Sequence, residues 1–165
     1  MPPFDPTSWR LVVDGLVSRP LALSLSDLLA LPRVIQESDF RCREGWQVKD
    51  LRWAGVRISH LLSAVAPLPL ARYVTIHAGP YTAALSLQEA ELPEVLLATD
   101  LDGAPLPLEH GGPVRLVVPA EWDCFTSVKW VQRLEVTQER AEPTGPAIAL
   151  ARIGREPAPS RPPPS

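Results

Sequence analysis

Short segments of alternating apolar and polar residues recur through the first 137 positions of the chain. Residues 9–24, WRLVVDGLVSRPLALS, predict two strands around a turn at Asp14 and Gly15. Residues 33–40, RVIQESDF, predict a third strand, and residues 46–55, WQVKDLRWAG, predict either a fourth strand or a wide turn. Such closely spaced short strands indicate a domain rich in β-sheet.

The same alternation returns in the second half of the chain. Residues 72–78, RYVTIHA, predict a strand in which successive side chains face opposite sides of a sheet. Residues 114–119, VRLVVP, are apolar enough for a central strand. Residues 127–136, SVKWVQRLEV, alternate again and predict a strand near the end of the domain.

Two segments carry helical signals instead. Ser24 and Asp27 form a capping-box pair, which predicts a short helix over residues 25–31 that stops before Pro32. Residues 57–67, RISHLLSAVAP, place apolar side chains three and four positions apart, which predicts an amphipathic helix.

The order of these elements indicates the fold class. Strands and short helices do not come in regular β-α-β units, so we expect an α+β domain of mixed β-sheets with short helices rather than a doubly wound sheet. The expected domain covers residues 9–137 and follows an N-terminal arm of residues 1–8. Residues 138–165 are rich in Pro, Gly and Ala with little periodicity, which favours an extended or disordered tail.

Composition and charge exclude several function classes. The chain has 165 residues, 45% of them hydrophobic, enough for a packed core in one domain. Its net charge of −3 argues against a nucleic-acid-binding protein that relies on bulk attraction to phosphates. No apolar run approaches the roughly 18 residues of a membrane span. The N-terminus, MPPFDPTSWR, lacks the features of an export signal, so we expect a cytoplasmic protein.

Cys42 is the first residue with potential chemistry. The chain has two cysteines, 82 positions apart, which favours reduced thiols over a disulfide framework. Cys42 lies between Arg41 and Arg43, and neighbouring guanidinium groups favour the thiolate, which is a nucleophile or a ligand for a soft metal. A structural role is the ordinary alternative for Cys42, and it is the role we expect for Cys124.

Other chemistries for this thiol lack support in the sequence. A thiol hydrolase needs a histidine base, and no protease or nucleophile-elbow signature surrounds His60, His77 or His110. A zinc site needs ligands at regular spacing, and the chain has no C-x-x-C motif. Hydrolysis and structural zinc are therefore disfavoured.

Residues 100–119, DLDGAPLPLEHGGPVRLVVP, form the second candidate. Gly111 and Gly112 allow a tight turn that we expect to expose backbone N–H groups beside His110, and Arg115 follows two residues after the turn. A histidine, free amides and an arginine on one loop suit an anionic ligand. An ordinary surface turn is the alternative.

Two more residues stand out against their neighbours. Lys129 lies between Val128 and Trp130 in the last predicted strand, where its ammonium either reaches solvent at a sheet edge or faces a bound anion. Trp130 is expected in the core. Tyr81 follows a Gly-Pro turn, where packing is the usual role of a tyrosine.

The order of these motifs resembles the oxidoreductase molybdopterin-binding domain shared by the sulfite oxidase family. The resemblance extends from about Trp9 to Val136. It includes the segments CREGW, WAGVRISHLL and GPYTAALSL, followed by LLATDLDGAPLPLEHGGPVRLVVP and SVKWVQRLEV. The run L-D-G-x-P-L-P-x-x-H-G-G-P-x-R-L-V-V-P, followed by V-K-W, is the most specific part.

The resemblance implies a cofactor and a role for the reactive cysteine. In that family the cysteine at the position of Cys42 binds molybdenum through its sulfur, beside the two dithiolene sulfurs of molybdopterin, a pyranopterin. Tyr81 matches a tyrosine that can hydrogen-bond an oxyanion substrate. Arg41, immediately before the metal ligand, is expected to add positive charge to the same pocket.

The phosphate-bearing end of the cofactor has its own implied residues. By the same resemblance His110 and Arg115 hold the pterin and its phosphate. Lys129 and the backbone near Ser127 and Val128 complete this phosphate site. A forked guanidinium beside an ammonium suits a phosphate dianion, so the chemistry of the side chains agrees with the resemblance.

The implied reaction is oxygen-atom transfer. An S- or N-oxide is reduced, or a sulfite-type oxyanion is oxidised, and a separate electron-transfer partner exchanges the electrons. The run Cys42-Arg43-Glu44-Gly45-Trp46 resembles the bacterial branch with the protein-methionine-sulfoxide reductases more than the sulfite-oxidising members. Two alternatives stay open: a non-catalytic module of the same fold that binds cofactor or protein, and a cofactor-free thiol enzyme that uses Cys42.

Overall fold

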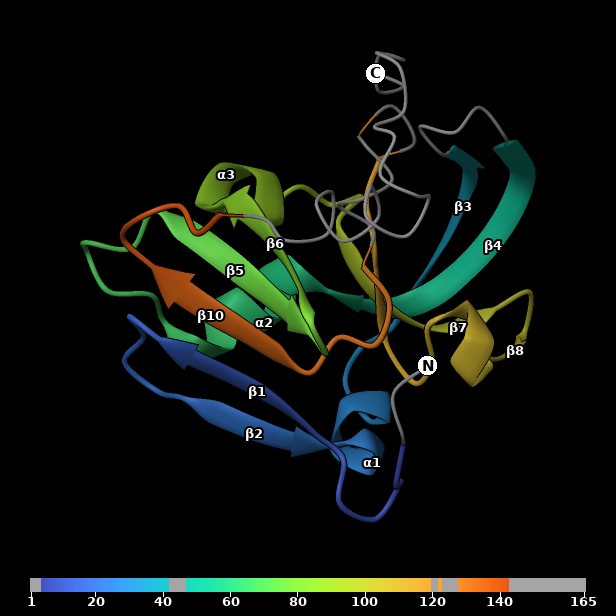
Figure 1. Cartoon of the computed structure of the whole chain (residues 1–165), viewed down its shortest axis with the longest axis horizontal. Helices are drawn as coiled ribbons and strands as arrows, with labels where there is room; N and C mark the ends of the chain where they lie inside the picture. Colours follow the sequence, from blue (N-terminus) through green and yellow to red (C-terminus); the bar gives the residue numbers. More distant parts are fainter. Residues whose placement is uncertain (1–3, 42–46, 120–121, 123–127, 143–165) are drawn as a thin grey trace.

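The computed structural model describes residues 4–41, 47–119, 122 and 128–142, with the backbone alone for residues 38–41 and 47–50. Short strands and very short helices alternate irregularly along the chain (Figure 1). In chain order the elements are β1 (Arg10–Gly15), β2 (Leu21–Ser24), α1 (Leu25–Leu29), β3 (Val34–Arg41), β4 (Gln47–Arg57), α2 (Ile58–Val65), β5 (Tyr73–Ala78), β6 (Tyr81–Ser86), α3 (Leu87–Ala90), β7 (Leu96–Leu101), β8 (Ala104–Pro105), the 3-10 helix η1 (Leu108–His110), β9 (Arg115–Val117) and β10 (Arg133–Thr137).

Two five-stranded sheets make up the described domain. The first has the strand order β2-β1-β10-β5-β6, and only its β1–β10 pair is parallel. The second has the order β3-β4-β7-β8, with β9 also paired to β7. In Figure 1 the two sheets lie side by side, and the long β3–β4 hairpin extends away from the first sheet. Mixed sheets with a few short helices confirm the predicted α+β class.

The main hydrophobic core packs the first sheet against α2 and part of the second sheet. Helix α2 buries its apolar side chains at Ile58, Leu61, Leu62 and Val65, the spacing from which it was predicted. Its buried face lies in one cluster with strand residues such as Leu134. A smaller cluster, centred on Trp53, lies on the second sheet and includes residues of β7 and β9.

One glycine at the end of β1 shows how tightly the first sheet is built. Gly15 has φ +91°, which side chains rarely tolerate, and a Cβ atom there would lie 2.3 Å from the carbonyl oxygen of Val136. The parallel β1–β10 pair ends at this residue. The predicted turn at Asp14 and Gly15 is wrong, because both residues belong to β1 and pair with β10, and the chain reverses over residues 16–20 before β2. Only glycine fits at position 15, where the strand meets the backbone of Val136.

Helix α1 matches the prediction at its start and differs at its end. The Ser24 hydroxyl accepts from the Asp27 amide, and the Asp27 carboxylate accepts from the Ser24 amide, which is the predicted capping box. The helix ends at Leu29, two residues before the predicted end, because the amide of Ala30 already forms the cap. An error of two residues is usual for a helix boundary.

The last predicted strand is wrong over its first half. Strand β10 begins at Arg133, and Trp130 has φ +60° in a bend rather than an extended conformation. The amides of Trp130 and Val131 donate to the carbonyls of Gly111 and Val114 instead of to a neighbouring strand. Lys129 therefore lies in a loop held against the turn at residues 111–114, and not in a strand.

Candidate anion-binding site

A Gly-Gly turn brings two cationic side chains together. Gly111 has φ +106°, and a Cβ atom there would lie 2.9–3.0 Å from side-chain carbons of Lys129 and Arg115. A Cβ atom on Gly112 would lie 2.0 Å from the carbonyl oxygen of Leu106. Both glycines are therefore needed. A side chain at position 111 would occupy the space in which the lysine and the arginine approach the turn, and one at position 112 would overlap the backbone of Leu106.

Three consecutive backbone carbonyls of η1 anchor the surrounding side chains. The Trp130 indole donates to the carbonyl of Leu108 at 2.8 Å, and the Lys129 ammonium donates to that of Glu109 at 3.1 Å. The Arg115 guanidinium donates through Nη1 to the carbonyl of His110 at 3.0 Å. A carbonyl oxygen can accept two hydrogen bonds, and the carbonyls at the C-terminal end of a helix attract cations. The short helix thus fixes both cationic groups through main-chain oxygens.

The electrostatics of this pair favour an anion. The Arg115 side chain is almost fully buried, and Lys129 is half-buried. Burial lowers the pKa of Lys129, and the nearby positive charge of Arg115 lowers it further. None of the ion pairs in the described part of the chain includes Lys129. An anion bound between these two groups would relieve their repulsion and raise the pKa of the lysine again.

Trp53 contributes to the site, and no sequence signal marked it. The residue comes from β4, is 3% exposed, and its ring lies under the Arg115 guanidinium, 5.3 Å from ring centroid to Cζ. Lys129 makes a similar contact, 5.8 Å, with the ring of Trp130. A cation over an aromatic face is held in orientation as well as attracted. Trp53 therefore supports the guanidinium from the side of the second sheet.

The expectation that the amides of the Gly-Gly turn are free is wrong. The N–H of Gly111 donates to the carbonyl of Leu108 at 3.0 Å, and that of Gly112 donates to Pro107 at 2.9 Å. Pro113 has no N–H group to offer. The turn closes its own hydrogen bonds because it continues directly from η1. The prediction of an anion-binding loop thus rests on the side chains of Arg115 and Lys129 rather than on these amides.

His110 and Val128 lie in the same loop system, whereas Tyr81 lies on the first sheet. His110 is the last residue of η1, and its imidazole is exposed. Val128 is buried, and its carbonyl accepts from the Leu116 amide at 2.9 Å. Tyr81 begins β6, and its half-buried ring packs against the main core. The amide of Gln132 donates to the carbonyl of His77 at 2.9 Å, which joins the Lys129 loop to the β5–β6 hairpin.

Several sequence candidates lie outside the described residues or at their border. Cys42, Cys124 and Ser127 are not among the described residues. Arg41 is the last residue of β3, and its side chain is not described. Strand β3 thus ends immediately before Cys42 in the sequence, as the predicted strand over residues 33–40 implied.

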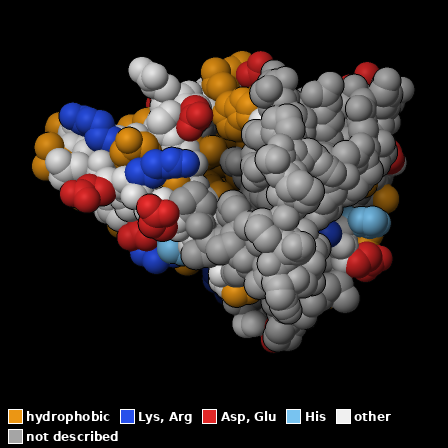
Figure 2. Space-filling view, turned by 45° about the horizontal axis from the view of Figure 1, so that its top comes forward, with side chains coloured by type: hydrophobic (Ala, Val, Ile, Leu, Met, Phe, Trp, Pro, Cys, Tyr) orange, Lys and Arg blue, Asp and Glu red, His pale blue; other side chains and the backbone are white. Residues whose placement is uncertain are grey.

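The described residues also give three general findings. They contain no cluster of three or more His, Cys, Asp or Glu side chains that could hold a metal ion. No helix in the described ranges has the length and apolar character to cross a membrane. Acidic and basic side chains lie side by side over the described part of the face in Figure 2, rather than forming one basic field.

Replacing Trp53 tests whether its ring orients the guanidinium. We expect Trp53→Leu to weaken the binding of inorganic phosphate about fivefold, because the residue stays apolar but loses the aromatic face. Trp53→Phe retains an aromatic face and is expected to lose less than twofold of the affinity. Titration calorimetry with phosphate measures both variants, and circular dichroism checks their fold. Equal losses in the two variants would show that Trp53 serves packing alone.

Comparison with known proteins places these features in a family. The family model for the oxidoreductase molybdopterin binding domain matches residues 1–144. A relative from Bacillus subtilis (strain 168), the uncharacterized oxidoreductase YuiH, is 37% identical over 136 residues, which cover 82% of this chain and 68% of that protein.

Two further relatives are catalytic subunits named MsrP of protein-methionine-sulfoxide reductases. The subunit from Pseudomonas syringae pv. tomato is 32% identical and is matched over 88% of this chain and 48% of its own length. The subunit from Campylobacter jejuni is 28% identical, with 92% and 56% covered. This chain thus spans about half the length of these two relatives.

A solved structure shares the fold. The sulfane dehydrogenase SoxCD from Paracoccus pantotrophus superposes with a TM-score of 0.76 at 26% sequence identity, over 86% of this chain and 41% of that chain. The comparison agrees with the arrangement of mixed sheets and short helices described above.

Proposed function

Because this chain belongs to the oxidoreductase molybdopterin binding domain family, we propose that it is a molybdenum-cofactor-dependent oxidoreductase that carries out oxygen-atom transfer, with Cys42 as the protein ligand of the metal. The observation that carries the proposal is the pair of Arg115 and Lys129, held together on the main-chain oxygens of η1. Such a pair suits the phosphate end of molybdopterin.

The described residues fit the anionic end of this cofactor. Arg115 is 6% exposed, and desolvation together with the arginine charge already lowers the pKa of Lys129. A phosphate next to two like charges that are close and partly buried lowers the cost of keeping them there. The close approach of both side chains to Gly111 leaves them aligned on one turn. Phosphate is the ligand that a guanidinium and an ammonium in this arrangement recognise best.

Each proposed cofactor contact has a separate task. Arg115 and Lys129 neutralise the phosphate, and the exposed His110 ring is the contact for the pterin. The backbone near Ser127 and Val128 completes the phosphate site. Cys42 supplies a thiolate, which the two flanking arginines of the sequence favour. When bound, the cofactor supplies the metal centre that accepts or donates an oxygen atom and changes by two electrons.

We propose a sulfoxide as the substrate class, because two relatives carry the name of methionine-sulfoxide reductases. The S=O bond breaks, two electrons and two protons are consumed, and the products are a thioether and water. Tyr81 donates a hydrogen bond to the substrate oxygen, and Arg41 adds positive charge as that oxygen gains negative character. An N-oxide, or a sulfite-type oxyanion in the oxidising direction, would use the same groups.

The two electrons need an outside source. Reduction of a sulfoxide consumes two electrons in each turnover, and the sulfoxide itself supplies none of them. We therefore propose a separate electron-transfer partner, for which a reduced viologen dye is the substitute in an assay.

The proposal is tested by expressing the chain in cells that make the molybdenum cofactor and in cells that do not. We expect about one molybdenum per chain from the first cells by elemental analysis. We also expect dye-driven reduction of methionine sulfoxide by this preparation and none by the second. Protein from cofactor-producing cells that contains no molybdenum would overturn the proposal. Protein that contains molybdenum but reduces no S- or N-oxide would favour the non-catalytic cofactor-binding module.

A further inference from the structure

One edge of the second sheet combines an exposed apolar side chain with charges of both signs. Strand β3 is the terminal strand in the described order β3-β4-β7-β8. Ile35, near its start, is 71% exposed, the highest value among the exposed large hydrophobic side chains described. Arg33 and Glu37 lie two positions on either side of Ile35, so all three side chains share one face of the strand.

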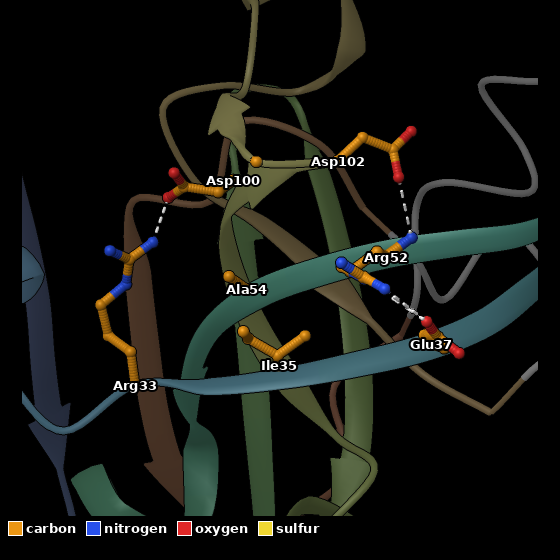
Figure 3. Close-up of a pocket in the computed structure, with 8 residues that line it drawn as sticks. Arg33, Ile35, Glu37, Arg52, Ala54, Asp100 and Asp102 are labelled. Carbon is orange, nitrogen blue, oxygen red and sulfur yellow. Dashed lines mark hydrogen bonds and ion pairs between the residues drawn. The ribbon is translucent and has the colours of Figure 1, made fainter.

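These side chains border a groove of about 580 Å³ that crosses β3, β4 and β7 (Figure 3). Arg33 forms an ion pair with Asp100, and Arg52 forms one with Glu37 at 3.0 Å. Ile35 lies opposite Ala54, and Ala54 lies opposite Asp100, in the registers of the three strands. The groove therefore has an apolar centre at Ile35 and paired charges on both sides of it.

The charges on β3 are arranged symmetrically around Ile35. Two copies of the strand, placed antiparallel and centred on this residue, put Arg33 opposite Glu37 of the partner subunit. They also put Ile35 opposite Ile35 of the partner subunit, where the two side chains would cover each other. Such a self-complementary patch is what a two-fold interface requires.

From this register we propose that the edge of β3 is the interface of a homodimer, in which β3 pairs antiparallel with the same strand of a second copy. The second sheet then continues from one subunit into the other. Across the interface the charges alternate in the order Arg52, Glu37, Arg33 of the partner subunit and Asp100 of the partner subunit. The Arg52–Glu37 ion pair of one subunit then lies beside the Arg33–Asp100 ion pair of the other, with Glu37 next to an arginine.

A second copy fits this edge better than a different protein would. The groove is lined by the arginines Arg33 and Arg52 and by the acids Glu37, Asp100 and Asp102, so the two signs nearly balance and offer little attraction to a strongly acidic or basic partner. An exposed edge strand pairs readily with another strand, and an apolar side chain on it strengthens that tendency. The combination of both features on residues 33–37 favours self-association.

The structure also limits the strength and the position of the interface. The β3–β4 register shifts between Ser38 and Phe40, so the regular part of β3 ends there. Pairing over so few residues predicts a weak, concentration-dependent dimer. Because the pairing is antiparallel, the two Arg41 ends of β3 point away from each other, each about 20 Å from the two-fold axis at a strand rise of 3.3 Å. The Cys42 positions that follow them would serve separate sites.

The test measures the molar mass of the full chain by sedimentation velocity between about 1 and 100 μM. We expect wild-type protein to shift from monomer to dimer over this range. Ile35→Lys is expected to weaken dimerisation at least tenfold, because it places two ammonium groups at the two-fold axis. The matched control is Leu70→Lys, at an apolar residue that is 56% exposed and distant in the sequence from β3. This control should dimerise like the wild type.

A charge exchange tests the register itself. Glu37→Arg alone places arginines opposite each other twice, and Arg33→Glu alone does the same with acids, so each variant should stay monomeric. Mixed together, the two variants pair every acid with an arginine, so a heterodimer is expected by native mass spectrometry. The proposal is overturned if the wild type stays monomeric at 100 μM, if Ile35→Lys and Leu70→Lys behave alike, or if the mixture forms no heterodimer.

Discussion

The variant Cys42→Ser is expected to lose at least a thousandfold of the methionine-sulfoxide reductase activity proposed for the wild type. A serine hydroxyl stays protonated at neutral pH and is a poor ligand for a soft metal, whereas the thiolate is a strong one. The flanking arginines favour an anion at position 42, and a neutral hydroxyl gains nothing from them. Activity is measured with reduced viologen as electron donor, at equal cofactor loading.

The amount of cofactor bound to each variant shows whether activity is lost because the metal ligand is missing or because the protein does not fold. We expect the serine variant to retain the pterin, because the phosphate end is held by Arg115 and Lys129, but to lose the thiolate-to-metal absorption in the visible spectrum. Cys124→Ser is the matched control and should retain both activity and absorption. A serine variant at position 42 with wild-type activity would exclude Cys42 as the metal ligand, whatever the control shows.

The variant Arg115→Met is expected to lose most of its molybdopterin. Methionine has a similar length and can cover the Trp53 ring, but it cannot donate to phosphate or to the carbonyl of His110. Loss of one partner from a buried, hydrogen-bonded charge pair costs about 2–5 kcal/mol, which corresponds to roughly 30- to several-thousand-fold weaker retention. The pterin and the molybdenum per purified chain give the measurement.

Two comparisons identify the cause of such a loss. Lys129→Met should reduce retention by about tenfold or less, because its half-exposed ammonium is more strongly screened by solvent. Arg72→Met removes an exposed arginine whose guanidinium donates to the carbonyls of Pro69 and Ala71, and it should leave pterin retention unchanged. If Arg115→Met is folded by circular dichroism and retains the pterin fully, Arg115 does not hold the phosphate.

Local signals in the sequence predicted the elements that depend on neighbouring residues. The capping box at Ser24 and Asp27 located α1, and the apolar spacing of residues 57–67 located α2. The same reasoning applies to Ser86 and Glu89, which form a second capping box at the start of α3. That helix is only four residues long and was not predicted, although its signal was present.

Contacts between distant segments could not be predicted in the same way. The alternation in residues 127–136 is that of a strand, but Trp130 and Val131 bond to the loop at residues 111–114. The choice between a strand and this loop depends on hydrogen bonds from another part of the chain, which local pattern does not encode. The error over the amides of Gly111 and Gly112 was local instead, because they donate to the carbonyls of Leu108 and Pro107 at the end of a 3-10 helix that was not predicted.

The residues of the candidate site also differ in whether a signal in the sequence marked them. Lys129 was found because a charged residue among apolar neighbours stands out in a sequence, and Arg115 was found because it closely follows the turn after His110. Trp53 did not stand out, since a tryptophan in an alternating strand is typical of a core position. Its role depends on the sheet that places β4 beside β9 through β7, which only the structure reveals.

The anchoring of both cations on the main chain of η1 has a consequence for how such sequences diverge. Carbonyl oxygens are the same whichever residues supply them, so this part of the scaffold places no demand on the identities of the side chains at positions 108 and 109. Selection to preserve the cation pair therefore acts on Gly111, Arg115 and Lys129, while residues 108 and 109 are free to drift among relatives as far as this anchoring is concerned.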